Sequence, residues 1–255
     1  MKKAFFTLAL TLVAFTGNAQ SNLDGDMNHD GEKNITDVML LVDEILNGSK
    51  PQSYLTCPDD HHPHMIDLGL PSGTKWACCN VGADKPEAYG GYYAWGETEE
   101  KERYDEESYS FFEWDYSVDF DQEIIIYTDL GDDIAGTEYD VAHVKWGGSW
   151  VMPSEGQIEE LLDNCSCAYI SKNGVKGGQF TGTNGGSVFL PAAGNRGDGV
   201  VYTTYPYGRY WSSTQNPSDP SDWYVAYSLT FASTSFSWIR NHYIYYGLTV
   251  RPVSR

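Results

Sequence analysis

From residue 65 onward, glycine and aromatic residues in short alternating runs restrict the chain to short strands joined by many turns. The 255 residues include 26 glycines, and 15% are aromatic. Aromatic side chains favour strands, and glycine permits the backbone conformations of tight turns. A period of two at 223–231 predicts a half-buried strand with one face made of Trp223, Val225, Tyr227, Leu229 and Phe231. Further strands are predicted at 187–190, 234–240 and 248–253, with 241–247 as the last connection.

One helix and one loop complete the expected elements of this region. Ser154 and Gln157 are spaced as in a capping box, and Ile158, Leu161 and Leu162 continue an apolar stripe. They predict a helix that begins after Ser154. The acidic, poorly patterned segment 97–133 is interpreted as a solvated loop.

The balance of charge excludes two classes of partner. The chain has 16 Lys and Arg against 36 Asp and Glu, a formal net charge of −20. Nucleic acids and anionic membranes are bound by clustered Lys and Arg, so neither is expected as a partner. No apolar run reaches the roughly 18 residues of a membrane span, so no transmembrane span is predicted.

The first 20 residues have the organisation of a secretory signal peptide. Lys2 and Lys3 precede an apolar stretch at 4–15, and small and polar residues follow, with a cleavage site after Ala19 or Gln20. A short anchor helix is the alternative. No cysteine lies near the cleavage site, so a lipoprotein anchor is not expected. The mature protein is predicted to be secreted, outside the cell or on its surface.

A calcium-binding loop is predicted directly after the signal peptide, at 26–37 (DMNHDGEKNITD). Oxygen-bearing side chains stand at loop positions 1, 3, 5, 9 and 12, with Gly31 at position 6 for the sharp turn. Ca²⁺ prefers six to eight oxygen ligands, and this spacing wraps the chain around the ion. The expected ligands are Asp26, Asn28, Asp30, Glu32 (through its backbone carbonyl), Asn34 (directly or through water) and Asp37.

The residues after this loop predict a helix, because Val38, Leu41, Val42 and Ile45 recur at helical spacing. Together, loop and helix at 21–48 resemble one repeat of a bacterial dockerin, the calcium-binding module of polysaccharide-degrading assemblies. Dockerins usually contain two such repeats, and this chain has one. The resemblance leaves two roles open: binding of a cohesin-like partner, or a calcium-stiffened spacer.

Residues 49–63 form a predicted linker, because Pro51, Pro58 and Pro63 interrupt regular structure. The histidines at 61, 62 and 64 stand beside two aspartates. They are interpreted as solvated, with Zn²⁺ or Cu²⁺ binding as the alternative.

Ordered motifs from residue 67 to residue 253 carry a second resemblance. They are DLGLPSGTKWA (67–77), CNVGA (79–83), GGYYAWGE (90–97), YDVAHVKWGGSW (139–150), MP (152–153), LPAAG (190–194), YWSST (210–214) and GLTVRPV (247–253). Residues 64–255 thereby resemble the major paralogous (FISUMP) domain of secreted bacterial proteins. The resemblance implies an irregular, aromatic-rich α+β fold, similar to C-type lectins and sulfatase-modifying factors, whose two ends meet.

The cysteine pairing is also implied by this resemblance. The five cysteines are Cys57, Cys78, Cys79, Cys165 and Cys167, and export permits disulfides. Cys79 and Cys165 match family positions, which implies a Cys79–Cys165 bridge. Cys78 and Cys167 form a plausible second pair, with Cys57 as a competitor for either.

No catalytic residues are predicted. The chain has no Gly-x-Ser-x-Gly elbow, no His-Glu-x-x-His and no phosphate-binding glycine loop, and it lacks the late cysteine pair of an oxidase. His143 and His242 stand among apolar or aromatic residues and are interpreted as structural.

Exposed aromatic residues favour carbohydrate as the ligand, because their faces stack on sugar rings. The predicted ligand-binding residues are Tyr202, Tyr205, Tyr207, Tyr210 and Trp211, and Tyr243, Tyr245 and Tyr246 form a second dense group. Burial in the core is the alternative for either group.

The sequence thus predicts a secreted, calcium-binding, non-catalytic protein of polysaccharide utilisation that binds a glycan or a cell-surface protein. A dockerin-tethered hydrolase of a polysaccharide-degrading complex and a structural or adhesive subunit are the alternatives.

Overall fold

The computed structural model describes residue 38 and residues 65–115, 124–197, 200–201, 207–216, 224–233 and 238–254. The predicted signal peptide and linker, and the calcium repeat apart from Val38, lie outside the described residues. Val38 is helical, and 54% of its surface is exposed. None of the described helices is long and apolar enough to cross a membrane.

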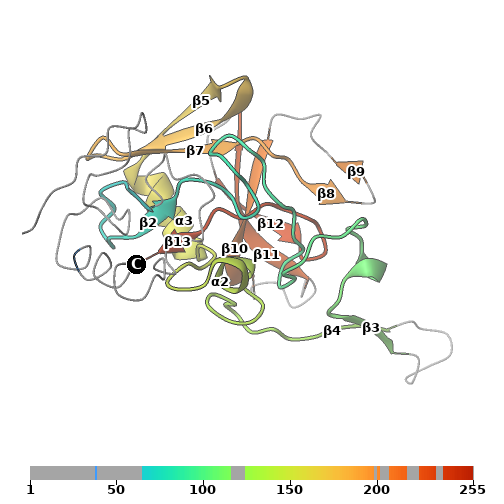
Figure 1. Ribbon diagram of the computed structural model, residues 1–255. Coiled ribbons are helices and arrows are strands. Elements are labelled where there is room, and N and C mark those ends of the chain that lie inside the picture. Colours follow the sequence, from blue (N-terminus) through green and yellow to red (C-terminus); the bar gives the residue numbers. More distant parts are fainter. Residues whose placement is uncertain are drawn as a thin grey trace, which may run out of the picture.

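The described part of the domain consists mainly of antiparallel strands with a few short helices (Figure 1). The helices are η2 (Glu106–Ser108), α2 (Val141–Trp146) and α3 (Glu155–Asn164). The strands are β1 (Met65–Asp67), β2 (Lys75–Ala77), β3 (Phe112–Asp115), β4 (Ile124–Tyr127), β5 (Ser166–Lys172), β6 (Val175–Thr181), β7 (Ser187–Pro191), β8 (Arg196–Gly197), β9 (Val200–Val201), β10 (Tyr207–Gln215), β11 (Val225–Ala232), β12 (Trp238–Tyr243) and β13 (Val253–Ser254). A mixed α+β class, in this coarse sense, is confirmed.

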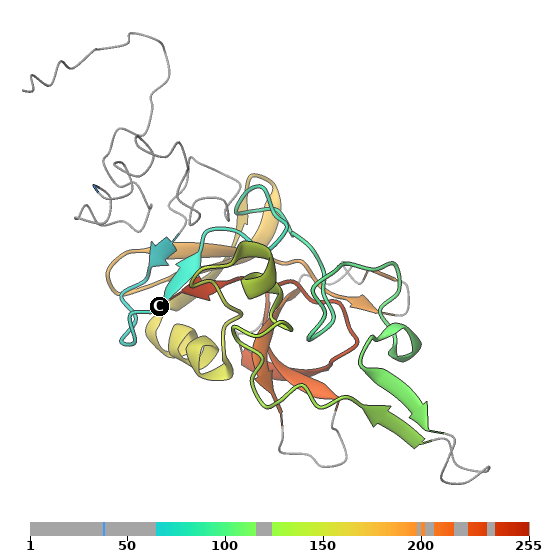
Figure 2. The ribbon, with the colours of Figure 1, turned by 60° about the horizontal axis from the view of Figure 1, so that its bottom comes forward.

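The strands form three small sheets and two hairpins. The sheets have the orders β1-β2-β13, β5-β6-β7 and β10-β11-β12, and the hairpins are β3-β4 and β8-β9. The β3-β4 hairpin extends away from the rest of the domain (green in Figure 2). The small size of each sheet agrees with the many turns that the glycine content predicts.

The strand predicted at 223–231 is β11, but the prediction that only one of its faces is buried was wrong. Leu229 and Phe231 are buried on one face, as expected, and Ala226 and Ser228 are buried on the other. The reason is that β11 lies between two apolar clusters, one on each face of its sheet. The neighbouring strand β12 ends at Tyr243, within the segment expected as a connection.

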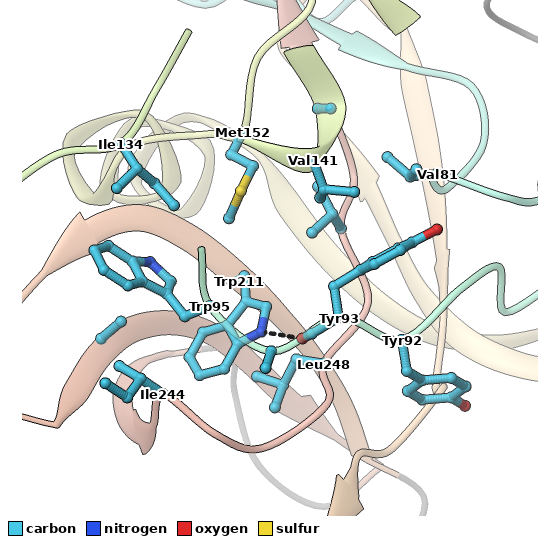
Figure 3. Close-up of a cluster of buried hydrophobic side chains, with 14 of the residues drawn as sticks. Val81, Tyr92, Tyr93, Trp95, Ile134, Val141, Met152, Trp211, Ile244 and Leu248 are labelled. Atoms are coloured by element: carbon cyan, nitrogen blue, oxygen red, sulfur yellow. Dashed lines mark hydrogen bonds between the residues drawn. The ribbon is translucent and has the colours of Figure 1, made fainter. Parts of the chain in front are cut away.

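The two clusters meet at β10, where consecutive side chains point to opposite faces of the sheet. Tyr210 belongs to one cluster and Trp211 to the other. Figure 3 shows Trp211 beside Trp95 and Met152, with its indole nitrogen donating to the Tyr93 carbonyl oxygen at 2.7 Å. Each face of the sheet thus has an aromatic core of its own.

The predicted helix is confirmed as α3. Ser154 Oγ accepts from the Gln157 amide, and the Gln157 side chain accepts from the Ser154 amide, so the capping box is complete. Ile158 and Leu161 are buried, which fixes the helix against the sheet.

The prediction that 97–133 is a solvated loop was wrong in part. Tyr104 and Tyr109 within this segment are buried, with 0% and 3% of their surface exposed. Tyr104 donates to the Tyr92 carbonyl and Tyr109 to the Trp95 carbonyl, so their polar ends are satisfied inside the core. These two tyrosines hold the acidic segment on the domain, although 17 of its 37 residues are charged.

The two ends of the domain meet at β2, as the resemblance implied. Strand β2 pairs with β1 on one side and with β13 on the other, and Trp76 stands opposite Val253. The C-terminal strand therefore closes the sheet that the first described strand begins.

A fully buried arginine fastens this closure. Arg251 has 0% exposure, and its guanidinium donates to Asn80 Oδ1 at 2.7 Å and to the carbonyls of Ala77 and Phe189 at 3.0 Å. The Pro86 carbonyl accepts a fourth, longer bond at 3.5 Å. Since a buried charge is costly without partners, these oxygens replace its water shell.

Arg251→Met is expected to lower the free energy of unfolding by about 3 kcal/mol or more, because buried acceptors lose their donors. Lys176→Met is the control, since Lys176 is an exposed cation on β6. Urea denaturation of both variants and the parent measures the difference. Equal stability of the two variants would contradict the role given to Arg251.

Candidate functional site

The first aromatic group predicted to bind a ligand is only partly on the surface. Tyr202 and Tyr205 lie outside the described residues. Tyr207 is half-buried, with the Arg209 guanidinium 5.4 Å from its ring centroid. The assignment of Tyr210 and Trp211 as ligand contacts was wrong, because their exposures are 1% and 0%. Both are core residues whose polar atoms donate to backbone carbonyls, so neither presents a face to a ligand.

The second aromatic group lies at the surface, at the last residue of β12 and in the turn that follows it. Tyr243 and Tyr245 stack almost in parallel, with an interplanar angle of 5° and a centroid distance of 5.2 Å. Tyr246 packs edge-on against both rings. Tyr243 is 41% exposed, and the other two are half-buried. We call these three residues the tyrosine turn.

Buried backbone contacts fix the tyrosine turn on the core. Ile244 stands between Tyr243 and Tyr245 in the sequence, and its side chain is buried, with 3% exposure. Its amide donates to the Tyr224 carbonyl at 2.8 Å. Its own carbonyl accepts from the Trp95 amide at 2.8 Å. The alternation of inward Ile244 with outward tyrosines therefore follows the strand pattern of β12 beyond its last residue.

Part of the acidic segment, including η2, lines the same cavity as Tyr245 of this turn. Asp105 caps η2, accepting from the Ser108 amide, while Ser108 Oγ accepts from the Asp105 amide. The Arg103 side chain donates to Asp105 Oδ2 through Nε at 2.8 Å and lies within ion-pair distance through its terminal nitrogen at 2.5 Å. Both guanidinium nitrogens contact the same oxygen, Asp105 Oδ2, and this charge-assisted contact holds the arginine against the cap.

Tyr127 on β4 connects the acidic segment with the tyrosine turn. Its hydroxyl donates to Glu106 Oε1, and its ring lies 4.5 Å from that of Tyr224. Tyr224 in turn provides the carbonyl that anchors Ile244. The positions of η2, β4 and the turn are therefore coupled through one tyrosine.

A cavity of about 380 Å³ lies between these elements. Its lining residues are Arg103, Asp105, Glu106, Glu107 and Tyr245. The pocket combines one aromatic residue, three carboxylates and one guanidinium, which supplies both apolar contact and hydrogen-bonding groups. Most small-molecule sites are mainly apolar with a few polar groups, and this pocket is more polar than that, since only Tyr245 among its described lining residues is uncharged. We call it the tyrosine pocket.

The charges in the tyrosine pocket are set by its hydrogen bonds. Burial raises the pKa of Asp105, but hydrogen bonds from Ser108 and Arg103 outweigh burial, and the net pKa is lowered. Asp105 is therefore a carboxylate at neutral pH. Burial, reinforced by the bond to Glu106, raises the pKa of Tyr127, which keeps this hydroxyl protonated as a donor.

The predicted calcium ligands Asp26, Asn28, Asp30, Glu32, Asn34 and Asp37 all lie outside the described residues. The histidines of the predicted linker lie outside them as well. Within the described ranges, no group of three or more His, Cys, Asp or Glu side chains is arranged to hold a metal ion.

The disulfide expected between Cys79 and Cys165 is not formed. Cys165 is a free thiol at the C-terminal cap of α3, whereas Cys79 is buried in a separate cluster with Cys78 and Ala83. Burial, with a smaller effect of Glu160, raises the pKa of the Cys165 thiol to about 11. The alternative Cys78–Cys167 pair is not joined within the described residues either, since Cys78 is buried while Cys167 is exposed on β5.

Sequence reasoning missed the pocket wall formed by 103–107. The signal was present as the Asp105-x-x-Ser108 capping pattern between two tyrosines, Tyr104 and Tyr109. The surrounding charges obscured it, because acidic segments are usually solvated. The interpretation of His242 as structural agrees with its place on β12, beside the core residue Trp211.

Comparison with known proteins adds no relative: no protein-family model, no curated protein and no solved structure matches this chain. The assignment of function therefore depends on the residues and geometry described above.

The protonation of His242 is expected to destabilise the fold in mild acid. Burial, followed by repulsion from Arg209 and Arg240, lowers the pKa of His242 to about 3, against 6.5 for an ordinary histidine. Between these two pH values His242 is protonated in the unfolded chain but neutral in the folded chain. The free energy of unfolding therefore falls as the pH drops from 6.5 towards 3. The loss amounts to a few kcal/mol at the acid end.

His242→Phe removes this titration while keeping an aromatic ring beside Trp211. Its unfolding free energy is expected to fall less between pH 6.5 and 4.5 than that of the parent protein. Denaturation curves across this range test the effect, and parallel losses in parent and variant would contradict the assignment.

Proposed function

We propose that this chain is a secreted, non-catalytic glycan-binding protein and that the tyrosine pocket is its binding site. The observation that carries the proposal is the partly exposed Tyr243–Tyr245 stack, anchored through Ile244 to the core, beside a cavity with carboxylates and a guanidinium. Tyrosine faces stack on the apolar faces of sugar rings, and fixed polar groups bind the hydroxyls at the edges.

The fixed position of these groups supports binding. Each side of the pocket is held by hydrogen bonds within the protein: Asp105 by the cap of η2, Arg103 by Asp105, and Glu106 by Tyr127. A ligand therefore does not have to order these groups. Ordering of side chains on binding costs affinity, and a preformed site avoids this cost. The saving matters most for a ligand that binds weakly, such as a sugar.

Binding is favoured over cleavage by the state of Asp105. A glycoside hydrolase needs one carboxyl group with a raised pKa as proton donor, together with a second carboxylate. The lowered pKa of Asp105 and the three contacts of its carboxylate with Arg103 and Ser108 make it unsuitable as that donor. The hydrolase alternative predicts release of new reducing ends, which binding alone does not produce.

The proposal includes the two family resemblances. Residues 64–255 are proposed to be a major paralogous domain with a C-type-lectin-like fold, and residues 21–48 a dockerin-like calcium repeat. Export by the signal peptide would place both outside the cell or on its surface. The repeat would then serve as a spacer, or would attach the glycan-binding domain to a cohesin-like partner.

Glycan binding is expected to depend on the tyrosine turn. Tyr243→Ala removes an exposed face of the stack and should weaken the best ligand of a glycan array by about tenfold, equivalent to about 1.4 kcal/mol. Tyr89→Ala is the matched control, because Tyr89 is 39% exposed against 41% for Tyr243. Calorimetric titration of both variants provides the measurement. Equal affinities in the two variants, or reducing-end release by the parent protein, would refute the proposal.

Calcium binding is expected to require the loop at 26–37. Asp26→Ala and Asp30→Ala each remove a carboxylate ligand and should abolish Ca²⁺ uptake at micromolar concentrations, whereas Asp24→Ala, just outside the loop, should preserve it. Equilibrium dialysis measures uptake, and a melting curve of the full chain shows whether the main domain is unaffected. Undiminished uptake in the first two variants would show that the ion binds elsewhere.

A further inference from the structure

The charge of the tyrosine pocket distinguishes among glycans. Its five lining residues comprise Asp105, Glu106 and Glu107 against Arg103, a formal charge of −3 + 1 = −2. Arg103 is engaged by Asp105 at 2.5 and 2.8 Å, and it lies 3.8 Å from Glu107. The positive charge is thus paired closely with Asp105 and more distantly with Glu107, and the two glutamates keep acceptor capacity for a further donor.

These two carboxylates differ in their surroundings, and both retain acceptor capacity. Glu106 accepts one hydrogen bond from Tyr127, and a carboxylate accommodates more than one donor. The Glu107 side chain is 73% exposed. A donor that enters the cavity meets both of them beside the ring of Tyr245.

An aromatic ring and a carboxylate together favour a cation, since the π face attracts positive charge. The same chemistry occurs inside this domain a few residues away. Lys101 Nζ lies 5.5 and 5.7 Å from the ring centroids of Tyr104 and Tyr109 and forms an ion pair with Glu97 at 2.8 Å. Among its described lining residues, the tyrosine pocket presents a carboxylate–tyrosine combination of this kind with Arg103 and no lysine.

Long-range electrostatics act in the same direction. The chain has a formal charge of −20, so it attracts cationic ligands and repels uronic acids and sulfated sugars. The net charge of the protein thus attracts a cationic ligand, and the cavity provides the specific contacts.

We propose that the tyrosine pocket selects glycans with free, protonated amino groups, that is, polymers of 2-amino-2-deoxyglucose that are not acetylated. This inference rests on the proposed function, since it specifies the ligand of the same site. The ammonium group lies against Glu106 and Glu107, and the sugar ring packs on Tyr245.

The test uses three β-1,4-linked hexasaccharides that differ only at carbon 2: the amine, its N-acetyl derivative and the hydroxyl compound. Calorimetric titration of the full-length protein, at a pH where the amine is protonated, is expected to give about tenfold tighter binding of the amine than of either other compound. Glu107→Gln should weaken binding of the amine about threefold, and the double variant Glu106→Gln/Glu107→Gln about tenfold, in line with partly exposed ion pairs. Both changes should weaken binding of the hydroxyl compound less than binding of the amine, because a Gln side chain still accepts hydrogen bonds from hydroxyls but does not pair with an ammonium charge.

Glu102→Gln is the matched control, because Glu102 is an exposed acid on the same segment that does not line the cavity. An equal effect of Glu102→Gln and Glu107→Gln would mean adsorption to a generally acidic surface and would overturn the inference. Equal affinity for all three oligosaccharides, lost in Tyr243→Ala, would overturn the inference while leaving the proposed function intact. Absence of binding to all three and to every glycan of the array would overturn both.

Discussion

The described domain depends on a cation buried without a carboxylate. The guanidinium of Arg251, which lies just before β13, is bonded to oxygens from two other parts of the chain: the end of β2 with the loop after it, and the strand β7. Since an arginine cannot be left buried without acceptors, its position fixes these segments relative to one another. The first and last strands of the domain therefore come together as one sheet, and the chain between them is confined to a closed loop of short elements.

The site follows from this confinement. The chain that follows the first acceptors of Arg251 pairs with the C-terminal part of the domain, because the backbones of Tyr93 and Leu248 are hydrogen-bonded to each other. Two indoles hold it there, because Trp95 donates to the Ser212 carbonyl and Trp211 donates to the Tyr93 carbonyl. The Trp95 amide then donates to the Ile244 carbonyl, and the tyrosine turn is presented outward from this base. The aromatic residues thus serve two purposes: those with satisfied polar atoms build the core, and those at the turn remain available to a ligand.

Local patterns in the sequence predicted the elements that local chemistry decides. The capping box of Ser154 and Gln157 identified α3, and the period of two identified β11, because both signals lie within a few residues. The sequence could not show that β11 has a core on each face, since this depends on Trp211 and Leu229 being covered by distant segments. The same limit explains why the first tyrosine group was preferred as the ligand site: both groups are rich in tyrosine, and only the fold buries Tyr210 and exposes Tyr243. The pocket wall at 103–107 was hidden because its anchors, Tyr104 and Tyr109, stand among charges.

Contact between a ligand sugar and the tyrosine turn is observed most directly by nuclear magnetic resonance of protein with isotope-labelled tyrosine rings, titrated with the best-bound oligosaccharide. We expect ring shifts at Tyr243, Tyr245 and Tyr246, with Tyr89 and Tyr207 unchanged. Shifts at Tyr207 with an unaffected turn, or saturable binding that moves none of the three rings, would contradict it.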